Sequence, residues 1–160
     1  MFIVAFFFAC EKKTENTGSV VFINELMPVN TTVVADQNGE YNDWIELYNI
    51  SDNEQDISGW FLSDNDKHIS KWQFPASTTI KGRGYLIIWA DDDSAQTGLH
   101  ANFKLSSLGE ELILSDPEGI TVDKALYPGQ SLELSYSRNP DGTGAFVWQI
   151  PTYLKSNIIK

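Results

Sequence analysis

Clustered carboxylates are the feature of this sequence most suggestive of chemistry, and that chemistry is the binding of a hard cation. They occur in three segments, Asp36–Glu40, Asp64–Asp66 and Asp91–Asp93. Ca²⁺ takes about six to eight oxygen ligands, which such segments supply when a fold brings them together. None has the spacing of an EF-hand loop, and Asx turns account for the first two. The candidate calcium ligands are Asp91, Asp92, Asp93, Asp64 and Asp66, and the segment Asp91–Asp93 is the least easily explained without a metal.

The sequence lacks the set of residues that a hydrolase would need. A catalytic triad requires a histidine base and a nucleophile; His68 follows the polar turn 64–67, where exposure to solvent explains it, and the strand context of His100 gives no nucleophile beside it. The sequence has no Gly-x-Ser-x-Gly nucleophile elbow. Asp43 and Glu46 are a candidate carboxylate pair for glycoside hydrolysis, but three residues apart on a strand they point to opposite sides. We expect neither enzymatic activity nor any cofactor besides calcium.

These two carboxylates belong to a stretch, Asp43–Asn49, in which large apolar and polar residues alternate at period two. Such alternation is typical of a strand with one buried face. If the aliphatic positions face the core, then Trp44, Glu46 and Tyr48 form an exposed stripe on the other side. An aromatic stripe of this kind would be a binding surface for sugar or protein.

The opposite orientation makes the same stretch structural. An inward-facing Glu46 would cost several kcal/mol unless it were hydrogen-bonded, and Arg83, Arg138 or a backbone amide would be suitable partners. We favour an arrangement in which Ile45 and Leu47 point inward while a neighbouring edge or loop shelters the tryptophan. Both orientations remain open at the level of the sequence.

The rest of the chain reads as short strands separated by turns. Ile57–Asp64 is predicted to be the strand beside Asp43–Asn49, and the wholly apolar Tyr85–Ala90 a central strand covered on both faces. No stretch of ten or more residues has helical periodicity. The fold class is therefore all-β, an antiparallel sandwich or barrel. The other predicted strands are 19–27, 69–75, 99–105, the hairpin 111–116 with 120–127, and the final pair 132–138 and 145–149.

The N-terminus predicts export and lipidation. Residues 1–9 are an uninterrupted apolar run that is too short to cross a bilayer, and Cys10 follows directly. Phe7-Phe8-Ala9-Cys10 resembles the lipobox of bacterial lipoproteins, which implies a lipid on Cys10. We expect residues 1–9 to be a signal peptide whose true start lies upstream. Residues 10–18 would then be the lipidated cysteine with a flexible tether, 19–151 the folded domain and 152–160 a tail.

Composition narrows the classes of partner. The 160 residues include 22 acidic and 11 basic side chains, for a net charge of −11, so the surface repels nucleic-acid phosphates. A single cysteine excludes an intrachain disulfide. We expect no nucleic-acid partner. Asp93-Ser94-Ala95 resembles a short bacterial O-glycosylation acceptor, which marks Ser94 as a candidate.

Several blocks taken together resemble the lamin tail domain, an immunoglobulin-like sandwich found in nuclear lamins and in bacterial extracellular proteins. The resemblance covers roughly residues 20–151. It implies an interaction module without catalytic residues. The blocks, in chain order, are Ile23–Met27, Asp43–Asn49, Ile57–Asp64, Trp72–Pro75, Gly84–Ala90, Leu99–Leu105 and Ser137–Gly142.

The sequence as a whole predicts a non-catalytic lipoprotein of the bacterial cell envelope. We expect a lipid on Cys10 to anchor it to the outer membrane, and we expect the domain to bind an unknown protein or glycan. The alternative is a calcium-stabilised carbohydrate-binding module. A third hypothesis is an accessory domain of a hydrolytic system.

Overall fold

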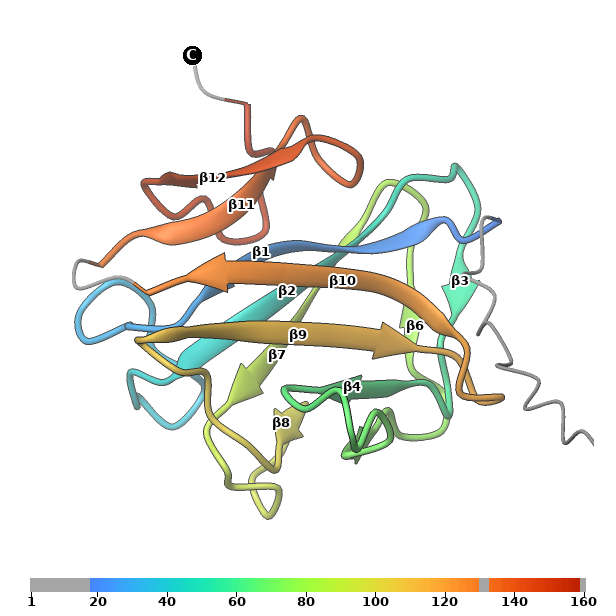
Figure 1. Cartoon of the computed structure of the whole chain (residues 1–160), viewed down its shortest axis with the longest axis horizontal. Helices are drawn as coiled ribbons and strands as arrows, with labels where there is room; N and C mark the ends of the chain where they lie inside the picture. The colour runs from blue at the N-terminus through green and yellow to red at the C-terminus, as the bar shows by residue number, and fades with distance from the viewer. Residues whose placement is uncertain (1–17, 130–132, 159–160) are drawn as a thin grey trace, which may run out of the picture.

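Residues 18–129 and 133–158 are described by a computed structural model, and the regular elements among them are all β-strands (Figure 1). Within these two ranges, no helix is long and apolar enough to span a membrane. The strands are β1 (Val21–Met27), β2 (Asp43–Asn49), β3 (Gln55–Asp56), β4 (Phe61–Ser63), β5 (Trp72–Gln73), β6 (Thr79–Ile80), β7 (Tyr85–Ala90), β8 (His100–Ala101), β9 (Gly109–Ser115), β10 (Thr121–Pro128), β11 (Ser135–Asn139) and β12 (Ala145–Gln149).

The larger sheet has six strands in the order β12-β11-β1-β2-β7-β8. Its neighbours are antiparallel except β7 and β8, which pair in parallel. Between Ile23 and Glu25 the register of β1 against β2 shifts, as at a β-bulge. Beyond this irregularity Glu25 lies directly opposite Glu46. Two carboxylic side chains therefore sit side by side in the middle of the sheet.

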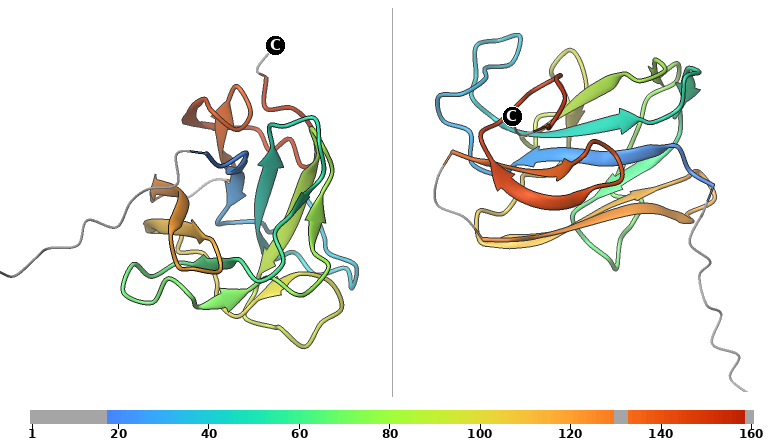
Figure 2. Two further views of the ribbon diagram at one scale, coloured as in Figure 1. Left: turned by 90° about the vertical axis from the view of Figure 1, so that its right-hand side faces the viewer. Right: turned by 90° about the horizontal axis from the view of Figure 1, so that it is seen from above.

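The second sheet has four strands, β10-β9-β4-β5, and lies against one face of the first (Figures 1 and 2). The core fills the space between them. Ile45 and Leu47 of β2 enter it from the larger sheet, Leu112 and Leu114 of β9 from the smaller one, and none is exposed. The two sheets with this core form the antiparallel, immunoglobulin-like sandwich that the sequence predicts.

The outer face of the six-stranded sheet has a second, smaller apolar cluster. It contains Met27, Trp44 and Trp89, with Tyr153 packed against them. The ring of Tyr153 meets that of Trp44 edge-on at 5.4 Å between centroids. Residues 152–157, which the sequence presents as a tail after the domain, therefore fold back and cover this face.

The prediction that the strand within Ile57–Asp64 lies beside Asp43–Asn49 is wrong. β2 and β4 lie in different sheets, because the polar segment 51–56 carries the chain from one sheet to the other and β4 pairs with β5 and β9. Alternation reveals that a strand has a buried face but not which sheet it joins. The hairpin of β9 with β10 is as predicted, and β11 and β12, the last two predicted strands, also pair with each other.

Candidate functional site

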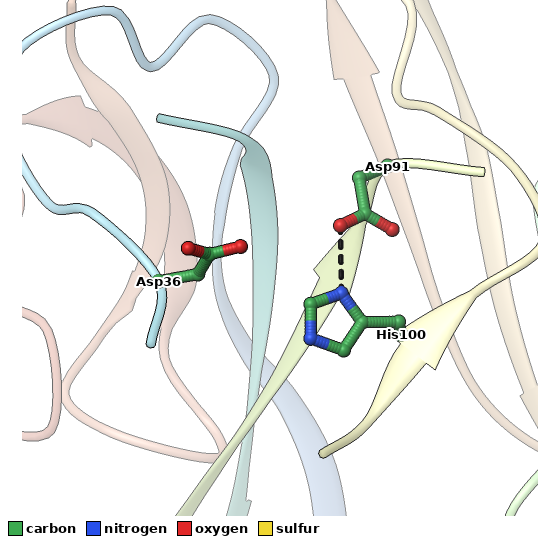
Figure 3. A group of neighbouring side chains, drawn as sticks. All are labelled: Asp36, Asp91 and His100. Atoms are coloured by element: carbon green, nitrogen blue, oxygen red, sulfur yellow. Dashed lines mark hydrogen bonds and ion pairs between the residues drawn. The ribbon is translucent and has the colours of Figure 1, made fainter. Parts of the chain in front are cut away.

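Three buried side chains with metal-ligating atoms meet at one end of the six-stranded sheet. Asp36 lies in the loop between β1 and β2, Asp91 follows β7 directly, and His100 begins β8. The parallel pairing of β7 with β8 sets Trp89 beside His100, and so brings the histidine close to Asp91. One ligand atom from each of the three lies within 4.8 Å of the others (Figure 3).

Hydrogen bonds fix the histidine on both sides. His100 Nδ1 lies 2.6 Å from Asp91 Oδ2. His100 Nε2 lies 2.7 Å from Gln37 Nε2, an amide nitrogen that also donates to the carbonyl of Thr97. Because the Gln37 amide nitrogen donates, Nε2 accepts this bond and Nδ1 donates to Asp91.

Asp36 organises its own loop and also faces the histidine. Its Oδ1 accepts from the backbone amides of Asn38 at 2.8 Å and Glu40 at 2.9 Å, an Asx-type turn. The Asn42 amide lies between the two carboxylates, 3.3 Å from Asp91 Oδ2 and 3.5 Å from Asp36 Oδ2. The network thus ties the loop between β1 and β2 to the end of β7.

A small polar cavity of about 160 Å³ adjoins this network. Asp43, Asp91 and Lys104 are among its lining residues. Burial raises the pKa of Asp43 to about 7, against the lowering effect of a backbone hydrogen bond from Leu105. The lining of this cavity thus includes two carboxyl groups, of Asp43 and Asp91, and one ammonium group, of Lys104.

One imidazole with two carboxylates is a donor set of Zn²⁺ or Mn²⁺ type. It offers too few oxygens for the six to eight or so that Ca²⁺ takes. A cation would have to displace the hydrogen bond between His100 and Asp91, so the same residues serve equally well as a structural network without metal.

The structure separates most of the predicted metal ligands. Asp91 joins the buried cluster, whereas Asp92 and Asp93 are exposed. Asp64 is paired with Lys71 at 2.7 Å, and Asp66 is exposed. The sequence pointed to His100 only as a possible base; the signal for a ligand was its position nine residues after Asp91, an aspartate at a strand end.

The predicted binding stripe on β2 is wrong for two of its three residues. Trp44 and Glu46 are 0% exposed, and only Tyr48 remains partly accessible. Glu46 accepts from Asn24 Nδ2 at 2.9 Å and from the backbone amide of Leu154 at 2.6 Å. A backbone amide is thus one of its partners.

Neither predicted arginine bonds to that carboxylate. Arg83 pairs with Asp52, and Arg138 pairs with Asp123. Burial raises the pKa of Glu46 to about 8, although the bond from Asn24 opposes the shift. The middle of β2 is therefore structural, with a carboxyl group that is largely protonated at neutral pH.

Tyr48 instead contributes to an open hollow of about 500 Å³ at the other end of β2. Its ring stacks on Tyr85 with 4.7 Å between centroids. The remaining lining includes Arg83, Pro140 and Asp141. Asp141 is held in place, because Asn24 Nδ2 donates to it at 3.0 Å and other donors come from the C-terminal segment. The hollow combines one aromatic ring, that of Tyr48, with a guanidinium group and a fixed carboxylate.

Comparison with known families agrees with this architecture. The family model of the Lamin Tail Domain matches residues 14–129. This chain belongs to the lamin tail domain family. The lamin tail domain is an immunoglobulin-like, non-catalytic interaction domain, in accord with the sandwich described above. A comparison with curated proteins finds no match.

Of the two predicted modification sites, the structure describes Ser94 but not Cys10. Cys10 lies outside the described residues, so its lipidation stays a prediction. Ser94 is exposed in the loop after β7, where a modifying enzyme could reach it, and its glycosylation likewise stays a prediction.

Proposed function

We propose that this lamin tail domain is a lipid-anchored binding module of the bacterial cell envelope. The apolar run before Cys10 and the polar residues after it support the anchor. The acidic composition, −11 overall, suits a surface that stays soluble beside a membrane and avoids nucleic acid. On this account the domain binds a ligand and catalyses no reaction.

The hollow beside Tyr48 is the observation that supports a glycan ligand. Sugar rings present C–H faces that pack on aromatic rings, and their hydroxyl groups hydrogen-bond to carboxylate and guanidinium groups. Here Tyr48 supplies the ring, and Arg83 and Asp141 supply the polar groups. A volume of about 500 Å³ lies within the range of small-ligand sites.

A glycan array probed with the full chain tests this assignment. We expect retention of a defined set of glycans, and a loss of at least tenfold in Tyr48→Ala. Tyr41→Ala is the matched control, because Tyr41 is 48% exposed and does not line this hollow. Retention of no glycan, or an equal loss in both variants, would contradict a glycan function.

The anchor needs a separate test. Intact-mass analysis of the envelope fraction should find a chain that begins at Cys10 and carries acyl groups. An unmodified chain that still starts at Met1 would contradict the lipid anchor, and it would not bear on whether the domain binds a glycan.

A divalent-cation function is the second candidate, supported by the Asp36–Asp91–His100 cluster. Its donor set predicts Zn²⁺ or Mn²⁺ in preference to Ca²⁺. Calorimetric titration with each of the three ions, in the wild type and in His100→Ala, distinguishes them. Absence of heat from every ion at millimolar concentration would leave the cluster as a structural network only.

A further inference from the structure

β12 forms an open edge of the six-stranded sheet. It pairs with β11 alone, over all five residues from Ala145 to Gln149. Along the other side of β12, no residue of the ranges 18–129 and 133–158 makes a backbone hydrogen bond to it. An edge strand of this kind presents N–H and C=O groups to which another extended chain can pair.

Unpartnered polar groups lie at the end of this strand. Both Nε2 and Oε1 of Gln149 are buried without a hydrogen-bond partner among the described residues. Ser135, directly opposite Gln149 in the register, is fully buried and its hydroxyl is also unpartnered within that part of the chain. A carboxamide with a free donor and a free acceptor complements another amide, such as a peptide main chain.

An apolar cavity of about 280 Å³ adjoins the same carboxamide. Gln149, Ile150, Pro151, Thr152, Asn157 and Ile158 line it. Several aliphatic side chains in residues 147–158 are exposed: Val147 is 37% exposed, Ile150 79%, Leu154 46% and Ile158 61%. Residues 145–154 include no charged side chain. The surface therefore suits an aliphatic group and a main chain better than a sugar or a charged ligand.

We propose that β12 and this cavity form a docking site for an extended peptide of a partner protein. The peptide adds a strand along β12 and inserts one large aliphatic side chain into the cavity. The Gln149 carboxamide, which is buried in the free protein, turns outward to pair with an amide of the peptide main chain. This site is separate from the hollow at Tyr48 and does not depend on the glycan assignment.

A second copy of this chain fits the site less well. A symmetric antiparallel pairing of two β12 strands centred on Val147 would place Ala145 of one copy opposite Gln149 of the other. A methyl group fills little of a cavity of about 280 Å³. The net charge of −11 on each copy also opposes self-association. A partner peptide with a larger side chain satisfies both the cavity and the strand edge.

Panning a phage-displayed library of random nonapeptides against the full chain provides the probe. We expect enriched peptides with a large aliphatic residue at a fixed position. A synthetic peptide of the enriched sequence should bind at least tenfold more weakly to Gln149→Leu and to Ile150→Asp. It should bind unchanged to Leu126→Asp, an exposed aliphatic of the other sheet that is 71% accessible. Thermal melting confirms that each variant is folded, and amide exchange should show new protection along β12 when the peptide is bound.

Three results would overturn the proposal. The first is enrichment of no peptide above the bare support. The second is an enriched peptide whose affinity is the same in Gln149→Leu, Ile150→Asp and Leu126→Asp. The third is a concentration-dependent dimer that Ile150→Asp dissociates, since a second copy would then occupy the edge.

Discussion

Glu46 is a carboxylic acid fully buried under the C-terminal segment, where its ionised form is disfavoured. Burial raises its pKa to about 8, and the neighbouring Glu25 adds to the shift. Burial likewise raises the pKa of Asp43, to about 7. Between pH 4.5 and 8 the unfolded chain therefore has Glu46 ionised while the folded protein keeps it protonated. Stability is fully present below this window and falls as the pH rises through it.

This linkage predicts a stability profile that declines toward alkaline pH. The free energy of unfolding should fall by a few kcal/mol between pH 5 and 9, because each unit of pKa shift corresponds to about 1.4 kcal/mol. Urea denaturation at constant ionic strength measures it. Glu46→Gln cannot ionise, so its decline should be smaller whatever its absolute stability. A variant with the same slope as the wild type would show that Glu46 ionises freely.

The pair of Asp91 and His100 makes a second prediction at the scale of residues. Both are buried and lie 2.6 Å apart, so Asp91→Ala leaves the histidine N–H without an acceptor. We expect the free energy of unfolding to fall by about 3 kcal/mol. Asp66→Ala, an exposed aspartate, should change it by less than about 0.5 kcal/mol. Equal values in chemical denaturation would mean that the cluster contributes nothing to folding.

Alternation predicted the burial of Ile45 and Leu47 but could not decide the fate of Trp44 and Glu46. Their cover comes from the C-terminal segment: Leu154 lies 108 residues along the chain from Glu46. The Asp36–Asp91–His100 cluster was hidden for the same reason, because it depends on the parallel pairing of β7 with β8. Local patterns identify strands and their core faces; contacts between distant segments decide which polar groups become sites.

At the scale of elements, the C-terminal segment behaves as a part of the sandwich. Thr152 donates through its amide to Glu25 at 2.9 Å, and Leu154 donates to Glu46 at 2.6 Å. To reach these carboxyl groups the backbone adopts positive φ at two successive non-glycine residues, 44° at Tyr153 and 59° at Leu154. Such conformations cost about 1–2 kcal/mol each in an L-residue.

The positive φ at Leu154 predicts that glycine is more stable than alanine at this position, the reverse of the usual order. Glycine normally destabilises a fixed backbone relative to alanine, but at φ 59° it removes the steric cost. Leu154→Gly should therefore be more stable than Leu154→Ala by about 1 kcal/mol, as measured by denaturation. The two variants lose the same partly exposed side chain, so the comparison isolates the backbone. A more stable alanine variant would show that the segment does not hold this turn in solution.

Which sheet each strand joins was the least predictable property of the elements. β2 and β4 have equally clear alternation, and the six polar residues between them suit a tight turn as well as a crossing between sheets. Hairpins were easier, because Pro117-Glu118-Gly119 and Asn139–Gly144 are dense in turn formers. The pairing of β9 with β10 was accordingly predicted from the sequence.

At the scale of the whole molecule, the family and the charge together limit the partners. A net charge of −11 predicts no affinity for a 30-base-pair DNA duplex, since no excess of cationic groups is available to release counterions. A mobility-shift assay with the full chain at 50 mM salt, where electrostatic binding is strong, should show free DNA only. A shift that disappears at higher salt would reveal a local basic surface that net charge conceals.

The C-terminal segment closes the domain, makes Trp44 and Glu46 structural, and leaves the Tyr48 hollow and the β12 edge as the surfaces for ligands. Amide hydrogen exchange at pH 6.5 can detect this closure. The amides of Thr152 and Leu154 should exchange slowly, like those in the middle of β2, while that of Lys155, which has no partner among the described residues, exchanges fast. Unprotected amides at all three positions would mean that the segment is open and that the β2 stripe is a surface after all.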